Sequence, residues 1–123
     1  MKTFTLDEAN ALIPQVARLL DEMLEMRGKL VAGGVSLESV LRHAGGNGGN
    51  KTSSKYVLLL QRFNASLTMF QELGCELKDL DQGLVDFPSY REGQLVYLCW
   101  KRGEDQIRFW HDLESGMAGR QPL

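Results

Sequence analysis

The residues best suited to chemistry lie in the last third of the chain. An imidazole titrates near neutral pH, and an imidazole beside carboxylates is the usual arrangement for general acid–base catalysis. His111 is close to Glu114 in the sequence, and Asp86 lies 25 residues earlier, so these three are the candidate catalytic residues. The same sequence would also suit a histidine that only ends a strand and hydrogen-bonds a carboxylate or a backbone group.

Side chains for ligand binding occur in the same region. Asp86 lies between two apolar residues, where an unpaired buried charge would be costly, so we expect Arg91 or Arg120 to pair with it. Such a pair would suit a purely structural role or a site for an anionic ligand equally well. The candidate ligand-binding residues are Arg91, Trp110, Arg120 and Tyr97.

The sequence alone predicts no metal site and names no cofactor. His111 and Asp86, with Cys99 and Glu114, could form a ligand set only if the fold brings them together, because no HxH, CxxC or HExxH pattern occurs. There is no GxSxG motif either, and Cys99 lies between a leucine and a tryptophan. We interpret it as a buried thiol and not as an activated nucleophile.

Composition restricts the class of protein. The 123 residues, 43% hydrophobic and 24% charged, are typical of one soluble globular domain, residues 1–123. A net charge of −2 without basic blocks argues against nucleic-acid binding. The longest nearly apolar run, Tyr56 to Leu60, is far shorter than the roughly 20 residues of a membrane span. With no secretion signal, we expect a cytoplasmic protein whose two cysteines are reduced.

Two long helices are predicted in the first 74 residues. A capping box, Thr5 with Glu8, starts a helix over about 5–30, and a second apolar period gives a helix over about 54–74 that ends at Gly74. Between them, residues 33–53 form a flexible connector with a glycine-rich stretch at 45–50, which lacks the preceding strand of a phosphate-binding loop. We expect the helices to pack antiparallel, as in a coiled coil. The apolar stripe of the first helix contains Ala9, Ile13, Val16, Leu20, Met23 and Leu30.

After Gly74, apolar and polar residues alternate with a period of two. This pattern indicates a β-meander over about 75–112, followed by a C-terminal tail over 113–123. The predicted strands are Leu84–Phe87, Gln94–Lys101 and Gln106–His111, with Pro88–Gly93 as a turn. Cys75–Lys78 would add a fourth strand at the edge. The fold class is therefore α+β, a long antiparallel helical hairpin followed by a small antiparallel meander.

Both faces of this sheet should be apolar. Leu98 and its alternate neighbours point one way and Tyr97 and Cys99 the other, and we expect Trp110 to share the face of Tyr97 and Cys99. A helical hairpin covers only one face, so the second needs a second copy of the chain, the connector, the C-terminal tail Gly116–Leu123 or a ligand. Two-fold dimers are the commonest oligomers, and the sequence therefore favours a homodimer.

Six short segments toward the two ends of the chain carry distinctive combinations of residues. They are Phe4–Pro14, Gly83–Pro88, Arg91–Gly93, Tyr97–Trp100, Trp110-His111 and Gly116–Leu123. In these motifs the chain resembles an uncharacterised conserved prokaryotic family, domain of unknown function 2203. The resemblance implies a small bacterial protein of helical-hairpin type, and it supplies no activity, cofactor or catalytic residue.

Two functions follow from these expectations. The first is a non-catalytic homodimeric module that binds another protein. The alternative is a small enzyme or ligand-binding domain, with or without a metal, whose pocket takes an anionic metabolite. The alternative gains support if Asp86, His111 and at least one arginine converge at a cavity.

Overall fold

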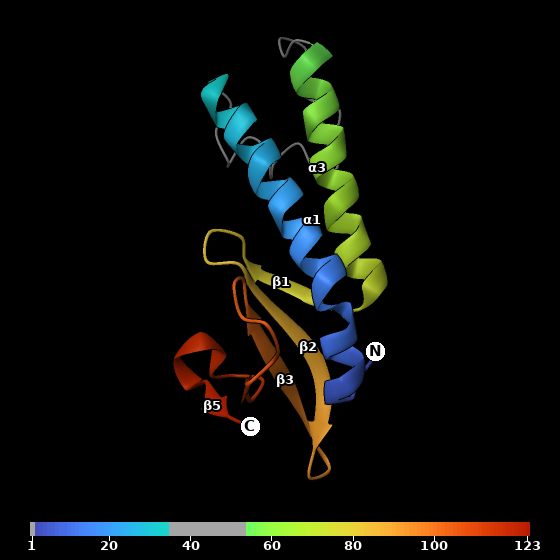
Figure 1. The fold of residues 1–123 in the computed structure, drawn as a ribbon, viewed down its shortest axis with the longest axis vertical. Helices are drawn as coiled ribbons and strands as arrows, with labels where there is room; N and C mark the ends of the chain where they lie inside the picture. Colours follow the sequence, from blue (N-terminus) through green and yellow to red (C-terminus); the bar gives the residue numbers. More distant parts are fainter. Residues whose placement is uncertain (1, 35–53) are drawn as a thin grey trace. The chain divides into compact units, whose positions relative to one another are not determined.

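The computed structural model describes residues 2–34 and 54–123, and it confirms the α+β class. Two long helices, α1 (Leu6–Ala32) and α3 (Ser54–Leu73), precede a five-stranded antiparallel sheet whose order is β1-β2-β3-β4-β5 (Figure 1). The predicted connector, residues 33–53, lies outside the described residues apart from its first two glycines. The strands and the short 3-10 helix are β1 (Glu76–Asp79), β2 (Leu84–Arg91), β3 (Gln94–Lys101), β4 (Phe109–His111), η1 (Gly116–Gly119) and β5 (Gln121–Pro122).

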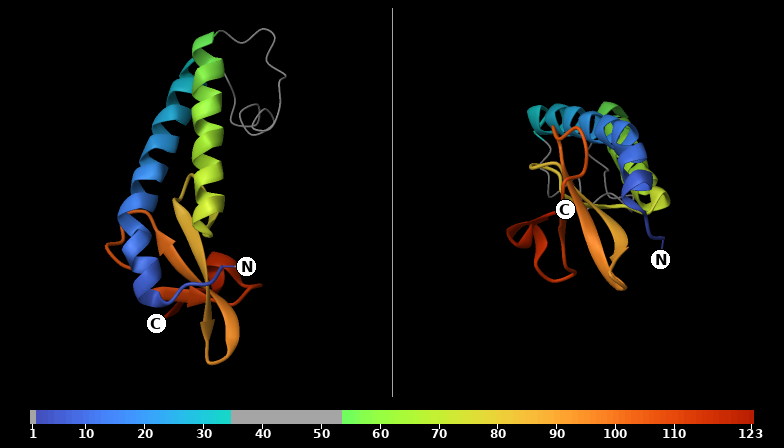
Figure 2. Two further views of the ribbon diagram at one scale, coloured as in Figure 1. Left: turned by 90° about the vertical axis from the view of Figure 1, so that its right-hand side faces the viewer. Right: turned by 60° about the horizontal axis from the view of Figure 1, so that its bottom comes forward.

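The chain divides into two compact units. One unit, Asp21–Met69, contains the second part of α1 and most of α3, which run antiparallel beside each other (Figure 2). Its buried residues include Met23, Leu30, Leu59 and Phe63. The other unit contains Met1–Leu20 and Phe70–Leu123, and therefore the first part of α1 and the whole sheet.

Local signals set the helix ends as predicted. The Thr5 N–H donates to Glu8 Oε1 at 2.8 Å, and the Glu8 N–H donates to Thr5 Oγ1 at 3.1 Å, so the capping box forms. Gly74 follows α3 with φ 91°, a left-handed conformation that favours glycine. Every residue of the predicted apolar stripe of α1 is buried.

The first part of α1 covers one face of the sheet (Figures 1 and 2). Phe87 on β2 meets the ring of Phe4 edge-on, with centroids 5.5 Å apart, and the hydroxyl of Ser89 donates to the Phe4 carbonyl at 2.6 Å. The side chain of Asn10 accepts the N–H of Ile107 at 2.8 Å. This face is apolar and closed, with Val85, Phe87, Val96, Leu98 and Trp100 at most 4% exposed.

The predicted ends of three strand segments were wrong. β2 continues through Pro88 to Arg91, where we predicted a turn. Proline is tolerated there because its backbone faces away from β3, and its carbonyl accepts the N–H of Phe4 at 2.8 Å instead. β4 is shorter than predicted, and β5 pairs with it from within the segment we expected to be a tail.

The face predicted for Trp110 was also wrong. β4 pairs with β3 so that Trp110 lies opposite Leu98, whereas His111 lies opposite Tyr97 and Phe109 opposite Cys99. Directly paired residues share a face, so Trp110 belongs to the face that α1 covers. The expected patch of Tyr97, Cys99 and Trp110 therefore does not form.

Candidate functional site

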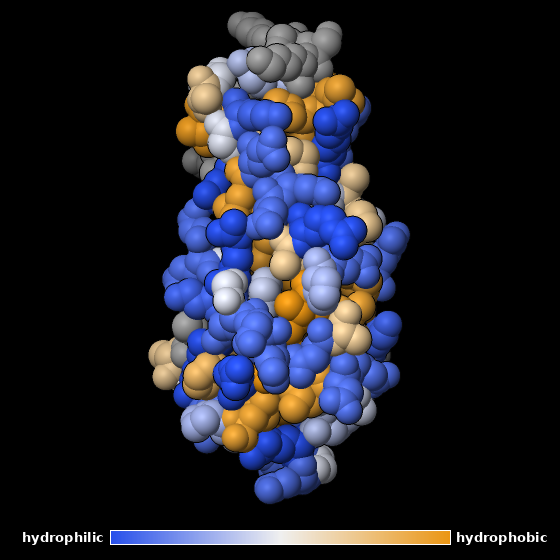
Figure 3. Space-filling model, viewed as in Figure 1, coloured by the Kyte–Doolittle hydropathy of each residue, from blue (hydrophilic) through white to orange (hydrophobic). Residues whose placement is uncertain are grey.

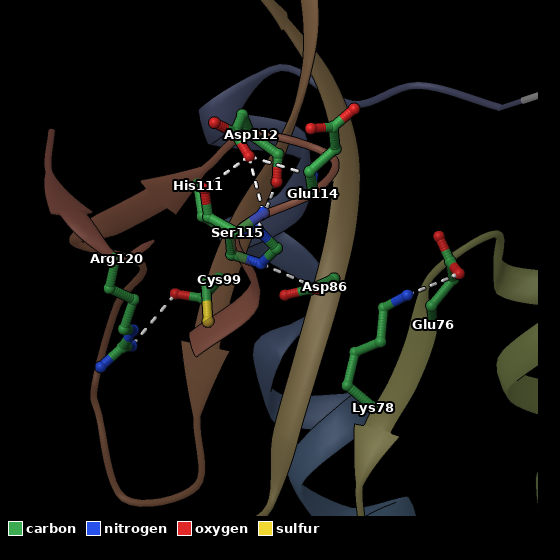
Figure 4. Close-up of polar contacts among 9 residues, drawn as sticks. All are labelled: Glu76, Lys78, Asp86, Cys99, His111, Asp112, Glu114, Ser115 and Arg120. Carbon is green, nitrogen blue, oxygen red and sulfur yellow. Dashed lines mark hydrogen bonds and ion pairs between the residues drawn. The ribbon is translucent and has the colours of Figure 1, made fainter. Parts of the chain in front are cut away.

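Three neighbouring strands place one polar side chain each on the face of the sheet opposite to α1. Asp86 on β2 is paired directly with Cys99 on β3, and His111 on β4 lies next to them (Figure 4). One ligand atom from each residue lies within 4.8 Å of the others. Their exposures are 2%, 1% and 2%, so a carboxyl, a thiol and an imidazole are gathered in the interior.

The hydrogen bonds of His111 define its protonation. Nδ1 lies 2.7 Å from the backbone oxygen of Asp112, which can only accept, so Nδ1 carries a hydrogen. Nε2 lies 3.0 Å from Asp86 Oδ2. Two lone pairs would repel each other at that distance, so a hydrogen lies between these two atoms. Either the imidazole or the carboxyl carries this hydrogen, and the other group accepts it.

Burial sets the charge state of the two acidic groups. Loss of solvent raises the pKa of the Asp86 carboxyl, although hydrogen bonding to His111 and its charge act in the opposite direction. Burial, together with the charge of Asp86, raises the pKa of the Cys99 thiol to about 11. Cys99 is therefore a neutral thiol at neutral pH, which suits the interpretation that it is not a free nucleophile.

A pocket of about 180 Å³ opens over these three residues. Its wall includes Lys78, which the sequence reasoning did not single out. The Lys78 ammonium lies 3.1 Å from Glu76 Oε1 and 4.8 Å from the centre of the Tyr97 ring. A hydrogen bond to Glu76 and partial burial raise the pKa of the Tyr97 phenol to about 12. The pocket lining consists of Lys78, Leu84, Asp86, Tyr97, Cys99, His111, Leu113, Glu114 and Gly116.

The C-terminal segment of the same chain covers this second face. Asp112 Oδ1 accepts the N–H groups of Glu114 at 2.9 Å and Ser115 at 2.7 Å, which fixes a turn beside His111. Arg120 Nη2 donates to Glu104 Oε1 at 2.7 Å and to the Cys99 carbonyl at 3.3 Å. The C-terminal tail, one of the four segments or molecules expected to cover the second face of the sheet, thus lies over it.

The predicted site residues fall into two groups. Asp86, His111, Tyr97 and Glu114 line the pocket, although Glu114 is exposed. Arg120 does not line the pocket. Its guanidinium donates to the backbone carbonyl of Cys99 and to the carboxylate of Glu104. The pairing of Asp86 with an arginine was wrong, because its partner is His111.

The other two candidate ligand-binding residues lie elsewhere. Arg91 lies 4.9 Å above the ring of Trp110, and both belong to the opposite face by register. Asp86 and His111 thus converge at a cavity, and the cation in its wall is Lys78 instead of an arginine.

Fold and site together define a small α+β protein that combines a helical hairpin with a sheet carrying a buried carboxyl, thiol and imidazole at a pocket. The chain belongs to the family described as uncharacterised conserved protein, DUF2203, whose model matches residues 2–123. No curated protein and no solved structure matches the chain significantly. Among the residues that the structure describes, no helix is long and apolar enough to cross a membrane.

Proposed function

We propose that this protein is a metal-dependent ligand-binding domain, in which the Asp86 carboxylate, the Cys99 thiolate and His111 Nε2 hold one divalent transition-metal ion. The observation that carries the proposal is the meeting of three different donor groups, all buried, within 4.8 Å at the floor of a pocket. Polar groups in an interior cost stability unless they are paired or bind something. A metal ion satisfies all three donors at once.

The orientation of His111 supports a metal. Histidine ligands usually donate their second ring N–H to a carboxylate or a backbone carbonyl, which fixes the ring and the tautomer. His111 does this through Nδ1 and the Asp112 oxygen, and its Nε2 is directed at Asp86. The proton between Nε2 and the carboxyl occupies the position that a metal ion would take over.

The same contacts support a metal better than general acid–base catalysis by His111. Both ring nitrogens are already engaged, one by a backbone carbonyl and the other by Asp86. A general base needs a nitrogen within hydrogen-bonding reach of the substrate. Metal binding needs only the replacement of the hydrogen between His111 Nε2 and Asp86 and of the Cys99 thiol proton, while His111 Nδ1 keeps its hydrogen on the Asp112 oxygen, and the metal itself lowers the pKa of a thiol ligand.

The donor distances are compatible with a tetrahedral ion. Zinc-to-ligand distances of about 2.0 to 2.3 Å place neighbouring donors roughly 3.4 to 3.6 Å apart. Nε2 and Oδ2, at 3.0 Å, need to separate by a few tenths of an ångström, and the Cys99 thiol, which lies up to 4.8 Å from the other two donor atoms, needs to move closer by up to about 1 Å. A thiolate and a carboxylate also balance the two positive charges of the ion, which favours its burial.

The donor types favour zinc or cobalt over magnesium or calcium, which prefer oxygen ligands only. The test is uptake of cobalt(II) by the purified protein after treatment with a chelator, followed by elemental analysis and by the near-ultraviolet absorption of a cobalt–thiolate bond. We expect one ion per chain, absent from the Cys99→Ser variant. The matched control is Cys75→Ser, because Cys75 is the other buried thiol and lies outside the cluster.

The thiolate band makes the test selective. Cobalt bound at surface carboxylates gives no such band, and a band that persists in Cys99→Ser would assign it to Cys75. Circular dichroism of both serine variants establishes that they fold. Failure of the folded wild type to retain cobalt, or equal retention by Cys99→Ser, contradicts the proposal.

A homodimeric protein-interaction module is the other function that the sequence favours. Its main support was the open second face of the sheet, and the C-terminal segment now lies over that face. In the view of Figure 3, hydrophilic residues cover most of the surface, and an apolar group lies toward the bottom of the view. The homodimer stays a prediction of the sequence, and native mass spectrometry tests it because a monomer would contradict it.

A further inference from the structure

The pocket over the proposed metal centre leaves room for a ligand from outside the protein. Within residues 2–34 and 54–123, the cluster of metal-type donors has three members, Asp86, Cys99 and His111. Zinc held by three protein ligands keeps a fourth position for water or substrate, whereas four protein ligands close the site. All three donors line the same pocket, so the fourth position faces that pocket.

The nearest alternative protein ligands are directed elsewhere. Glu114 lines the pocket but is exposed, and Figure 4 shows its carboxylate directed away from Asp86 and His111. The Tyr97 phenol is engaged with Glu76. Neither side chain reaches the metal position in this arrangement, and the site stays open.

A cation in the pocket wall selects the charge of the ligand. Lys78 lines the pocket, and its contact with Glu76 at 3.1 Å uses one of the three N–H donors of the ammonium. The proposed metal centre with its thiolate and carboxylate is neutral overall, and Glu76 partly balances the charge of Lys78, so Lys78 offers a ligand its two remaining N–H donors and a partly balanced positive charge. The exposed Glu114 carboxylate at the rim disfavours a second negative charge on that ligand.

We infer that the pocket binds a small monocarboxylate, with one carboxylate oxygen on the metal ion and the other on the Lys78 ammonium. This inference rests on the proposed function, since it requires the metal. The volume of about 180 Å³ is below the range of roughly 300 to 1,000 Å³ for drug-sized ligands, so only a short carbon chain fits. Leu84 and Leu113 offer that chain apolar contacts.

The test uses the cobalt-loaded full chain and acetate as the probe. Coordination of acetate changes the visible absorption of cobalt, so we expect a saturable spectral change in the wild type. Lys78→Met should weaken acetate binding about tenfold, the usual effect of losing one charge-assisted hydrogen bond. Cobalt uptake by Lys78→Met should equal that of the wild type, because Lys78 is not a metal ligand.

The control for the loss of charge is Lys29→Met. The side chain of Lys29 is 58% exposed in the helical unit and pairs with Glu25 at 3.3 Å, so its replacement should leave acetate binding unchanged. Phosphate, titrated in parallel, should bind more weakly than acetate because it carries the additional negative charge.

Each failure has a separate meaning. Absence of cobalt uptake overturns the proposed function. Cobalt uptake without an acetate response, or with equal acetate affinities for wild type and Lys78→Met, overturns this inference and leaves the metal centre intact. Tighter binding of phosphate than of acetate overturns the monocarboxylate.

Discussion

The two faces of the sheet are both buried, but by different means. On one face, which the first part of α1 covers, Phe87 meets the ring of Phe4 just before the helix, and the buried residues Val85, Val96, Leu98 and Trp100 are all apolar. On the other face, an irregular C-terminal segment lies over Asp86, Cys99 and His111 and leaves a pocket. Since apolar packing stabilises a fold more than a buried polar cluster does, only the first face is built for stability.

The buried polar cluster on the second face is not explained by the stability of the fold. A buried pair such as Asp86 and His111 can often be replaced by apolar residues of similar size without loss of stability. The chain nevertheless holds a carboxyl, a thiol and an imidazole where apolar side chains would pack. In the proposed function, the second face binds the metal and the ligand, and the first face supports it.

The largest effect should come from the apolar face. Phe87→Ala removes a ring that is fully buried and in edge-on contact with Phe4, and it leaves a cavity. We expect a loss of about 3 to 5 kcal/mol in the free energy of unfolding, measured by urea denaturation. Tyr90→Ala on the same strand, at a position 65% exposed, should change it by less than about 0.5 kcal/mol. Equal effects of the two substitutions would contradict the assignment of the core.

The second face should respond differently to one and to two substitutions. Asp86→Leu alone leaves Nε2 of buried His111 without its partner and should cost about 3 kcal/mol in metal-free protein. The double variant Asp86→Leu/His111→Leu should recover to within about 1 kcal/mol of the wild type, or exceed it, because no buried pair is broken. Urea denaturation in the presence of a chelator measures both. A double variant less stable than Asp86→Leu would show that the pair serves the fold.

The sequence predicted what depends on neighbouring residues. The Thr5 and Glu8 capping box, Gly74 and the stripe of α1 follow from spacing within one helix, and all of them formed. His111 and Asp86 were recognisable because polar residues in an apolar strand require a partner. Their meeting, however, depends on the pairing of strands 25 residues apart.

The errors share one physical cause, which is strand register. Trp110 was assigned to the wrong face because the chain between β3 and β4 is irregular, so alternation could not be extended across it. Lys78 was overlooked because a lysine on an edge strand is ordinarily a solvent-exposed residue, and Lys78 is exposed while it also lines the pocket. Only the register of β1 on β2, which pairs Glu76 with Asp86, brings that strand to the pocket.

Metal binding should stabilise the second face without involving the first. Zinc at a free concentration 100 times its dissociation constant should raise the free energy of unfolding by about 2.7 kcal/mol. Zinc should raise the free energy of unfolding of Phe87→Leu by the same amount, because Phe87 lies on the face that α1 covers. It should not stabilise the double variant Asp86→Leu/His111→Leu. Thermal denaturation with and without zinc measures these differences. Stabilisation of the double variant by zinc would place the bound ion elsewhere.

The smallest effect should come from the start of α1, which covers the first face. Hydrogen bonds from the backbone and side chain of Thr5 lower the pKa of the exposed Glu8 carboxyl. A lowered folded-state pKa contributes stability above the ordinary pKa of 4.5, and this contribution is lost as the pH falls through the lowered value. Glu8→Ala should therefore lower the melting temperature slightly at pH 7, and the difference from the wild type should vanish in acid.

Thr5→Ala, which removes the other half of the capping box, should cost about 1 kcal/mol at neutral pH. Cobalt uptake and acetate binding should be unchanged in both capping variants, because Phe4, next to Thr5, contacts Phe87 on the apolar face of the sheet. Melting curves between pH 3 and pH 7, with cobalt uptake measured at pH 7, separate the two faces again. A capping variant that loses the metal would show that the cover of the first face also positions the donors on the second.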